Sequence, residues 1–472
     1  MLDDHNFVFW YTKSADGKLH NFSAFLNETN FGEYPSGLRF TPTLDVLFAG
    51  RTTIFPNDPK YWFLANFILV LLTYVAIYSA VKLYLNNKDV IQNDIPSFFA
   101  ALVGVLSLCN SVGARIFPRL GTGEAYAFLF LSSSFFCIQK VLKDPYKKRY
   151  WLYLFVLDGL LIGCKENYIW LNILFSLIIL YNFKNEGQRI RLRKRIYVFF
   201  STIQFLFILL GFLPAALTVK NDIYGRGTSS TYILESLMSL VFQKYFIFAL
   251  TGSILLFAIS RNSNNKRSIN LLLIISISFL VVDQVYYRGS INDHYLANRV
   301  IAFVFLICAV VKFILERNRM QGMVTPLIAI TLILMIYSNY PKGAQRVNSH
   351  FRATVTFSNS LDKIFQSRQE FPQFAFVAQS SWDYESIFSV AKQLRARGDT
   401  RKFYLFSSRI PEGLRDSTTD SFQIWMKDGV GENLYSPIRF YEQQLKTICA
   451  YSQNQNLKLD ECDDGELIIW LP

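Results

Sequence analysis

The chain is organised around a succession of ten apolar segments separated by short charged links. A helix needs about twenty predominantly apolar residues to cross the hydrocarbon core of a bilayer. With 51% hydrophobic and 16% aromatic residues, the chain differs from an average soluble globule. We therefore predict a polytopic α-helical membrane protein of about ten transmembrane helices. The segments lie at 61–83, 96–112, 122–142, 150–164, 168–183, 195–217, 240–259, 268–287, 296–315 and 324–339.

The cationic residues predict the orientation of these helices. The formal net charge is +13, but Lys and Arg concentrate in the links after the third, fifth, seventh and ninth segments, as in 140–149 and 184–195. Short links rich in Lys and Arg stay on the cytoplasmic side of a membrane. Topology thus explains the charge better than nucleic-acid binding, which we discount, and both ends of the chain are expected outside the cytoplasm.

The stretch 150–183 admits two interpretations. Two helices with "CKENY" between them leave each about fifteen apolar residues, which is short for a span. A single long helix would place one of the two flanking basic clusters on the outer side. We prefer two short or tilted crossings with Lys165 and Glu166 at the outer turn.

Three regions follow from this topology. Residues 1–60 form a first extracytoplasmic loop, 61–339 a transmembrane helical bundle and 340–472 an extracytoplasmic domain. In the last region, "FAFVAQ" and "KFYLFSS" are typical of buried strands and 383–398 of an amphipathic helix, which predicts a small α/β C-terminal domain. No apolar helix stands before Met1 to carry the outer loop across, so we expect a first transmembrane helix to be missing from the sequence.

The topology brings ionisable residues from several links to one outer face. Arginine and lysine donate charge-assisted hydrogen bonds to phosphate oxygens. A carboxylate beside a bound hydroxyl can take its proton as the oxygen attacks a carbon that bears a leaving phosphate. The combination predicts group transfer from a lipid phosphate. The candidates are Asp3, Asp4, Arg39, Arg51, Arg115, Arg119, Glu124, Lys165, Glu166, Lys220, Arg226, Asp283, Arg288, Asp293, His294 and Arg299.

Four motifs carry a family resemblance. "DD" at the start of an outer loop, "GLRFTP" before the next helix, "GTGEAY" entering a later helix and "KEN" at an outer turn resemble the integral-membrane glycosyltransferases of the GT-C fold. This superfamily includes protein mannosyltransferases and the lipid A aminoarabinose transferase. The resemblance implies a multi-helix bundle with a small extracytoplasmic C-terminal domain, and a polyprenyl-phosphate sugar as donor.

The resemblance also implies site residues. An acidic residue of the first outer loop lies at the reacting centre of the family, which corresponds to Asp3 or Asp4 here, and an acid of the second outer loop corresponds to Glu124. It further implies inverting transfer to an acceptor hydroxyl of a surface glycan, lipid or protein. For binding of the substrate and its phosphate we expect Arg39, Glu124, Lys165, Glu166, Arg115, Arg226 and Arg299.

Other interpretations remain. An O-antigen-type polymerase or ligase is also a many-helix protein with charged outer loops, and a transporter would show repeated halves and ionisable residues at mid-membrane. We expect no cofactor; a divalent metal stays an open alternative through His5 and His294, although no spacing resembles a ligand set. The expected location is a bacterial inner (plasma) membrane, in a multi-pass arrangement.

Overall fold

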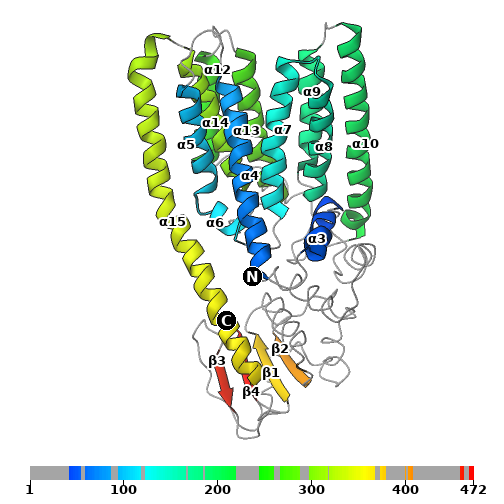
Figure 1. The fold of residues 1–472 in the computed structure, drawn as a ribbon, viewed down its shortest axis with the longest axis vertical. Helices are drawn as coiled ribbons and strands as arrows, with labels where there is room; N and C mark the ends of the chain where they lie inside the picture. The colour runs from blue at the N-terminus through cyan, green and yellow to red at the C-terminus, as the bar shows by residue number, and fades with distance from the viewer. Residues whose placement is uncertain are drawn as a thin grey trace.

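The computed structural model shows a bundle of long helices joined by one extended helix to a small sheet (Figure 1). It is the structure of a helical membrane protein. The residues that it describes are 42–54, 59–86, 94–118, 123–165, 168–183, 187–218, 244–259, 266–287, 297–316, 318–366, 373–378, 399, 402–407, 458–461 and 467–471.

A helix occupies all or part of each of the ten predicted apolar segments. These helices are α4 (Pro59–Leu85), α5 (Asp94–Leu108), α7 (Gly123–Lys143), α8 (Lys148–Cys164), α9 (Ile169–Asn182), α10 (Gln188–Thr218), α12 (Lys244–Ile259), α13 (Lys266–Tyr287), α14 (Ala297–Leu315) and α15 (Asn318–Gln366). Among the described residues, α4, α7 and α15 each contain a stretch that is long and apolar enough to cross a membrane. Shorter apolar helices occur in α5, α9, α13 and α14.

The ambiguous stretch 150–183 forms two helices. The first, α8, ends at Cys164, and Lys165 follows it in an extended conformation with φ −157° and ψ 118°. The next helix, α9, begins at Ile169. Helix α8 starts at the basic α7–α8 link, so Lys165, which follows its last residue, lies at the opposite end of the bundle, which faces the sheet. This agrees with the predicted turn on the side away from the basic links.

Two helices were not expected from the sequence. Residues 42–54 of the predicted outer loop form α3 (Pro42–Ile54), and the link between α5 and α7 contains the short α6 (Gly113–Ile116). Figure 1 shows both at the end of the bundle nearest the sheet.

Aromatic rings fill the centre of the bundle. Phe135 of α7 stacks on Phe305 of α14 with ring centroids 4.4 Å apart. Phe279 of α13 lies 5.8 Å from Phe305, and Phe175 of α9 lies 6.2 Å from Phe135. These contacts join four helices around one apolar core, in stacked, tilted and edge-to-face geometries that favour aromatic pairs.

Buried polar contacts tie further helices together. Lys312 of α14 donates to the carbonyl oxygen of Tyr84 at 2.7 Å and so satisfies an orphan carbonyl in the last turn of α4. The hydroxyl of Tyr197 in α10 donates to the carboxylate of Asp158 in α8. Asp158 lies in an apolar stretch of the sequence, and its tyrosine partner only appears in the fold.

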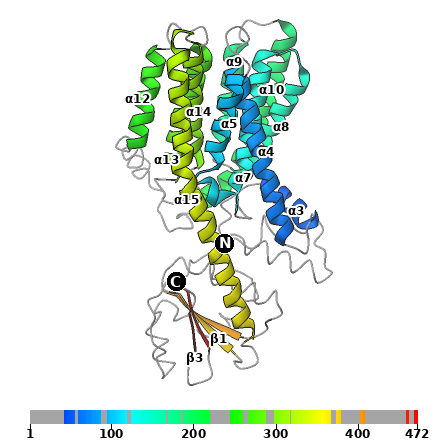
Figure 2. The same cartoon turned by 60° about the vertical axis from the view of Figure 1, so that its left-hand side comes forward.

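The last helix, α15, is much longer than the predicted segment 324–339. It spans 49 residues and passes through Pro326 and Pro341 without ending, which corresponds to about 73 Å at 1.5 Å per residue. Figure 2 shows it leaving the bundle and reaching the sheet. The expected domain boundary at residue 340 therefore falls inside a continuous helix.

The sheet has four strands in the order β2-β1-β4-β3. Strand β1 (Gln373–Ala378) pairs in parallel with β2 (Lys402–Ser407) and with β4 (Leu467–Leu471), and β3 (Lys458–Glu461) pairs antiparallel with β4. Strands β1 and β2 lie where "FAFVAQ" and "KFYLFSS" predicted them. The predicted helix at 383–398 lies outside the described residues, so the α/β character of this domain stays a prediction.

Candidate functional site

Three helix ends converge where the bundle faces the sheet. The start of α3 packs on the end of α8, and the start of α7 lies beside both. Two glycines permit this approach: a Cβ on Gly163 would overlap Thr43 of α3, and a Cβ on Gly123 would lie 3.1 Å from the carbonyl oxygen of Cys164. Small residues let helix backbones come together in this way.

The convergence buries an ion pair between two predicted site residues. Glu124 lies in the first turn of α7 and is 4% exposed; Lys165 follows the last turn of α8 and is 7% exposed. The ammonium of Lys165 contacts the carboxylate of Glu124. A carboxylate at a helix N-terminus and a cation at a helix C-terminus are each favoured by the helix dipole. The "GEAY" and "KEN" motifs thus meet through opposite charges.

A second polar network lies next to this pair and centres on Arg51 of α3. Arg51 is buried and donates to the hydroxyl of Tyr126 at 2.9 Å and to Oδ1 of Asn66 at 2.7 Å. Asn66 of α4 donates to the carbonyl oxygen of Phe117 at 2.9 Å. The network therefore connects α3, α4, α7 and the link after α6.

Burial lowers the pKa of Arg51 from its ordinary value, and the interaction with Tyr126 opposes that shift. A guanidinium keeps its charge even so. The guanidinium therefore stays positively charged while it binds Tyr126 and Asn66.

The link from α5 to α7 is held in a defined conformation by Asn110. Its Oδ1 accepts hydrogen bonds from the backbone N–H groups of Val112 and Gly113, both at 2.9 Å, and its Nδ2 donates to the carbonyl oxygens of Leu106 and Ser107. This side chain caps both the end of α5 and the start of α6. It fixes the half-buried Arg115, a predicted phosphate ligand, at the same end of the bundle.

The structure describes only some of the remaining predicted site residues. Arg299 lies in the first turn of α14, a helix that starts at this end of the bundle. Asp3, Asp4, Arg39, Glu166 and Arg226 lie outside the described residues. Within the described part of the chain, no group of three or more His, Cys, Asp or Glu side chains has the arrangement of a metal site.

Three members of the site were given no role by the sequence. Asn66 and Asn110 lie within apolar segments of the sequence, and a polar residue in such a segment indicates a buried polar contact. Tyr126 stands inside the "GEAY" motif, two residues after Glu124. The partners of Asn66 and Tyr126 come from other elements, so only the fold shows what these two side chains bind. Asn110 instead binds backbone groups within four residues of itself.

No protein-family model and no curated protein matches this chain. Among solved structures, it is similar to the archaeal oligosaccharyltransferase AglB from Archaeoglobus fulgidus, determined in complex with an inhibitory peptide and a dolichol-phosphate. The TM-score is 0.43 at 13% sequence identity, and the match covers 83% of this chain and 60% of that one. The match thus covers less than two thirds of AglB, and a likeness this distant carries no argument about function.

Proposed function

We propose that this protein is a membrane glycosyltransferase that moves a sugar from a polyprenyl-phosphate donor to an acceptor hydroxyl on the extracytoplasmic side. The observation that carries the proposal is the buried pair of Glu124 and Lys165. Two short motifs that resemble the same enzyme superfamily, far apart in the sequence, meet at the bundle end opposite the basic α7–α8 link.

In the proposed reaction, Asp3 or Asp4 takes the proton of the acceptor hydroxyl. The oxygen attacks the anomeric carbon of the sugar, the bond from that carbon to the phosphate oxygen breaks, and the polyprenyl phosphate leaves with both electrons. Attack opposite the leaving group inverts the anomeric centre. The acceptor is a surface glycan, a lipid or a protein, and the location is an inner membrane with both ends of the chain extracytoplasmic.

The arginines hold the leaving phosphate in this proposal. Arg39, Arg115, Arg226 and Arg299 are the candidates, since guanidinium groups bind phosphate oxygens in bidentate fashion. Lys165 and Glu124 neutralise each other below the surface. We assign this pair the task of holding the end of α8 against the start of α7 beside the bound donor, while Glu166 contributes to binding of the substrate.

The experiment supplies membranes that contain the full-length protein with labelled polyprenyl-phosphate sugars and measures transfer. Asp3→Asn or Asp4→Asn is expected to abolish transfer without lowering expression. Asp144→Asn is the matched control, because Asp144 is a half-buried aspartate in the link at the other end of the bundle, and it is expected to keep full activity. Wild-type transfer by both single variants and by the Asp3→Asn/Asp4→Asn double variant would overturn the proposal.

A further inference from the structure

A polar cluster lies inside the bundle between α7, α8 and α10. Its members are each at most 3% exposed, and we call them the Asp158 cluster: Ser134 of α7, Asp158 of α8, and Tyr197 and Ser201 of α10. At 1.5 Å per residue, Asp158 lies about 15 Å along α8 from its start at Lys148, and so in the middle part of this 17-residue helix. Ionisable side chains at this depth are rare, costly and usually functional.

The Asp158 cluster is connected through its side-chain oxygens. The hydroxyl of Tyr197 donates to Oδ2 of Asp158. Ser134 lies within reach of the same carboxylate, and Ser201 lies within reach of the Tyr197 hydroxyl. The fold therefore brings one carboxylate, one phenol and two serine hydroxyls together from three helices.

Three of these oxygens form no hydrogen bond of good geometry within the described part of the chain. They are Oδ1 of Asp158 and the Oγ atoms of Ser134 and Ser201. Nearly all buried polar atoms in proteins have a partner, so each exception calls for an explanation. No basic side chain among the described residues forms an ion pair with Asp158. The cluster therefore offers oxygen ligands and one carboxylate charge that the described side chains do not neutralise.

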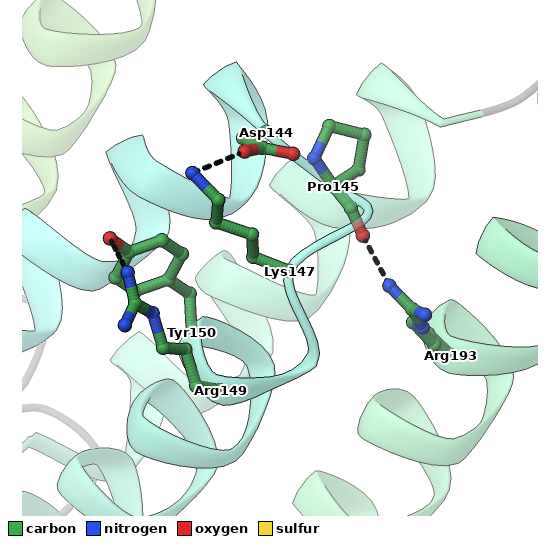
Figure 3. Close-up of polar contacts among 6 residues, drawn as sticks. All are labelled: Asp144, Pro145, Lys147, Arg149, Tyr150 and Arg193. Atoms are coloured by element: carbon green, nitrogen blue, oxygen red, sulfur yellow. Dashed lines mark hydrogen bonds and ion pairs between the residues drawn. The ribbon is translucent and has the colours of Figure 1, made fainter.

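Contacts at the end of the bundle away from the sheet fix α10 on α8. Figure 3 shows Arg193 of α10 reaching the carbonyl oxygen of Pro145, to which it donates at 2.8 Å. Trp151 of α8 donates to the same oxygen at 3.0 Å, and its ring lies 6.1 Å from the ring of Tyr197. Arg193 and Tyr197 are four residues apart and so share the face of α10 that packs on α8. These contacts hold Tyr197 in place beside Asp158.

Further polar side chains lead from the cluster towards the end of the bundle that faces the sheet. Gln204 follows Ser201 by three residues on α10, so both lie on one face of the helix. Its Nε2 donates to the carbonyl oxygen of Phe155 at 3.1 Å, and its Oε1 accepts a hydrogen bond from Asn172 at 3.4 Å. Asn172 lies near the start of α9, a helix that begins at that end. These amides mark a polar route through an otherwise apolar part of the bundle.

We propose that the Asp158 cluster binds one monovalent metal cation, with the carboxylate of Asp158 and the hydroxyl oxygens of Ser134 and Ser201 as ligands. Oxygen atoms are the ligands that hard cations take. One carboxylate balances one positive charge, whereas a divalent ion would leave a net charge in the apolar interior, which is costly. The hydroxyl of Tyr197 orients the carboxylate. Packing of α8 on α10 would explain the bond from Tyr197 alone; the oxygens without partners are what fit an ion.

The test uses sodium as the probe and measures thermal unfolding of the full-length protein in neutral detergent. Sodium chloride replaces choline chloride stepwise at constant ionic strength. A saturable rise in Tm is expected, because an ion that binds only the folded protein stabilises it. Asp158→Asn keeps the size of the side chain but removes its charge, and is expected to abolish this rise. Ser134→Ala is expected to raise the sodium concentration at half-saturation about tenfold, the change that fits the loss of one polar contact.

The matched control is Asp144→Asn, which removes a carboxylate outside the cluster. Asp144 lies in the α7–α8 link and pairs with Lys147, with Oδ2 and Nζ 2.9 Å apart (Figure 3). This variant is expected to respond to sodium like the wild type. Equilibrium binding of radiolabelled sodium to the purified protein is the second measurement, and Ser134→Ala takes the place of Asp158→Asn if that variant does not fold.

Three results would overturn the proposal. The first is the absence of saturable sodium binding in both measurements. The second is an unchanged sodium response in the variants at 158 and 134, or an equal loss of the response in the Asp144→Asn control. The third is a Tm that rises on acidification without any dependence on sodium, which would assign the positive charge in the cluster to a proton.

Discussion

At the scale of single residues, the pair of Glu124 and Lys165 shows how a buried charge depends on its partner. Both side chains are almost fully buried, and each ion is costly to remove from water unless the other is present. The pair therefore holds α7 to α8 mainly because loss of one partner would leave the other charge buried, and less because of the net attraction between the two charges.

A double-mutant cycle follows from this. Glu124→Gln or Lys165→Met alone is expected to destabilise the protein by about 3–5 kcal/mol, because each leaves a buried charge without its partner. The double variant is expected to recover a large part of that loss. Unfolding temperatures in detergent provide the measurement. If the effects of the two single variants simply add in the double variant, the two side chains do not act as a pair.

The contacts of Arg51 depend on the shape of its guanidinium group, because this one group donates hydrogen bonds to two acceptors in two helices. Arg51→Lys keeps the charge but offers a single nitrogen, so it cannot reach Tyr126 and Asn66 together. A loss of about 1–3 kcal/mol in stability is expected. Arg352→Lys, at an exposed position of α15, is the control and should be neutral. Equal melting of both variants would argue against the network.

At the scale of elements, close contact between helix ends depends on glycine. Gly163→Ala would drive a Cβ into Thr43 and push α3 away from α8. We expect a loss of about 1–3 kcal/mol and faster proteolysis of α3. Gly322→Ala in α15 meets nothing within 4 Å, so it should stabilise its helix by up to about 1 kcal/mol. Opposite signs for the two substitutions are the expected result, and a stable Gly163→Ala protein would contradict the packing.

The helix α15 is the element that links membrane and sheet. At about 73 Å it exceeds the thickness of a bilayer with its headgroups, which is about 40–45 Å. Along the apolar stretch Val324–Ser349, almost every residue is exposed or half-buried within the protein. Lipid is therefore the natural surrounding of this apolar stretch.

At the scale of the whole molecule, the placement of the two ends of the helical bundle on opposite sides of a membrane is testable. Single cysteines at positions 147 and 352 occupy exposed sites, one in the α7–α8 link and one in the lower part of α15. In intact cells, a membrane-impermeant maleimide is expected to label position 352 and not position 147 until the membrane is opened. Labelling of both sites before permeabilisation would remove the proposed topology and with it the proposed reaction site.

The sequence by itself determined the helical segments and their alternation. The length of an apolar segment and the charges beside it are local properties of the sequence, and the bilayer selects both. The break between α8 and α9 could therefore be predicted from the basic clusters on either side of 150–183. The extension of α15 beyond residue 340 did not follow, because a polar helix outside the membrane carries no hydropathy signal.

Only the tertiary structure decided which polar residues meet. Asn66, Tyr126 and Asp158 stand in apolar or motif sequence with partners that are distant along the chain. The pairing of Glu124 with Lys165 likewise needed the close approach of helices at Gly123 and Gly163. The hydropathy pattern shows which polar residues would be costly in free energy if they faced lipid. The partner that offsets this cost is determined by how the helices pack.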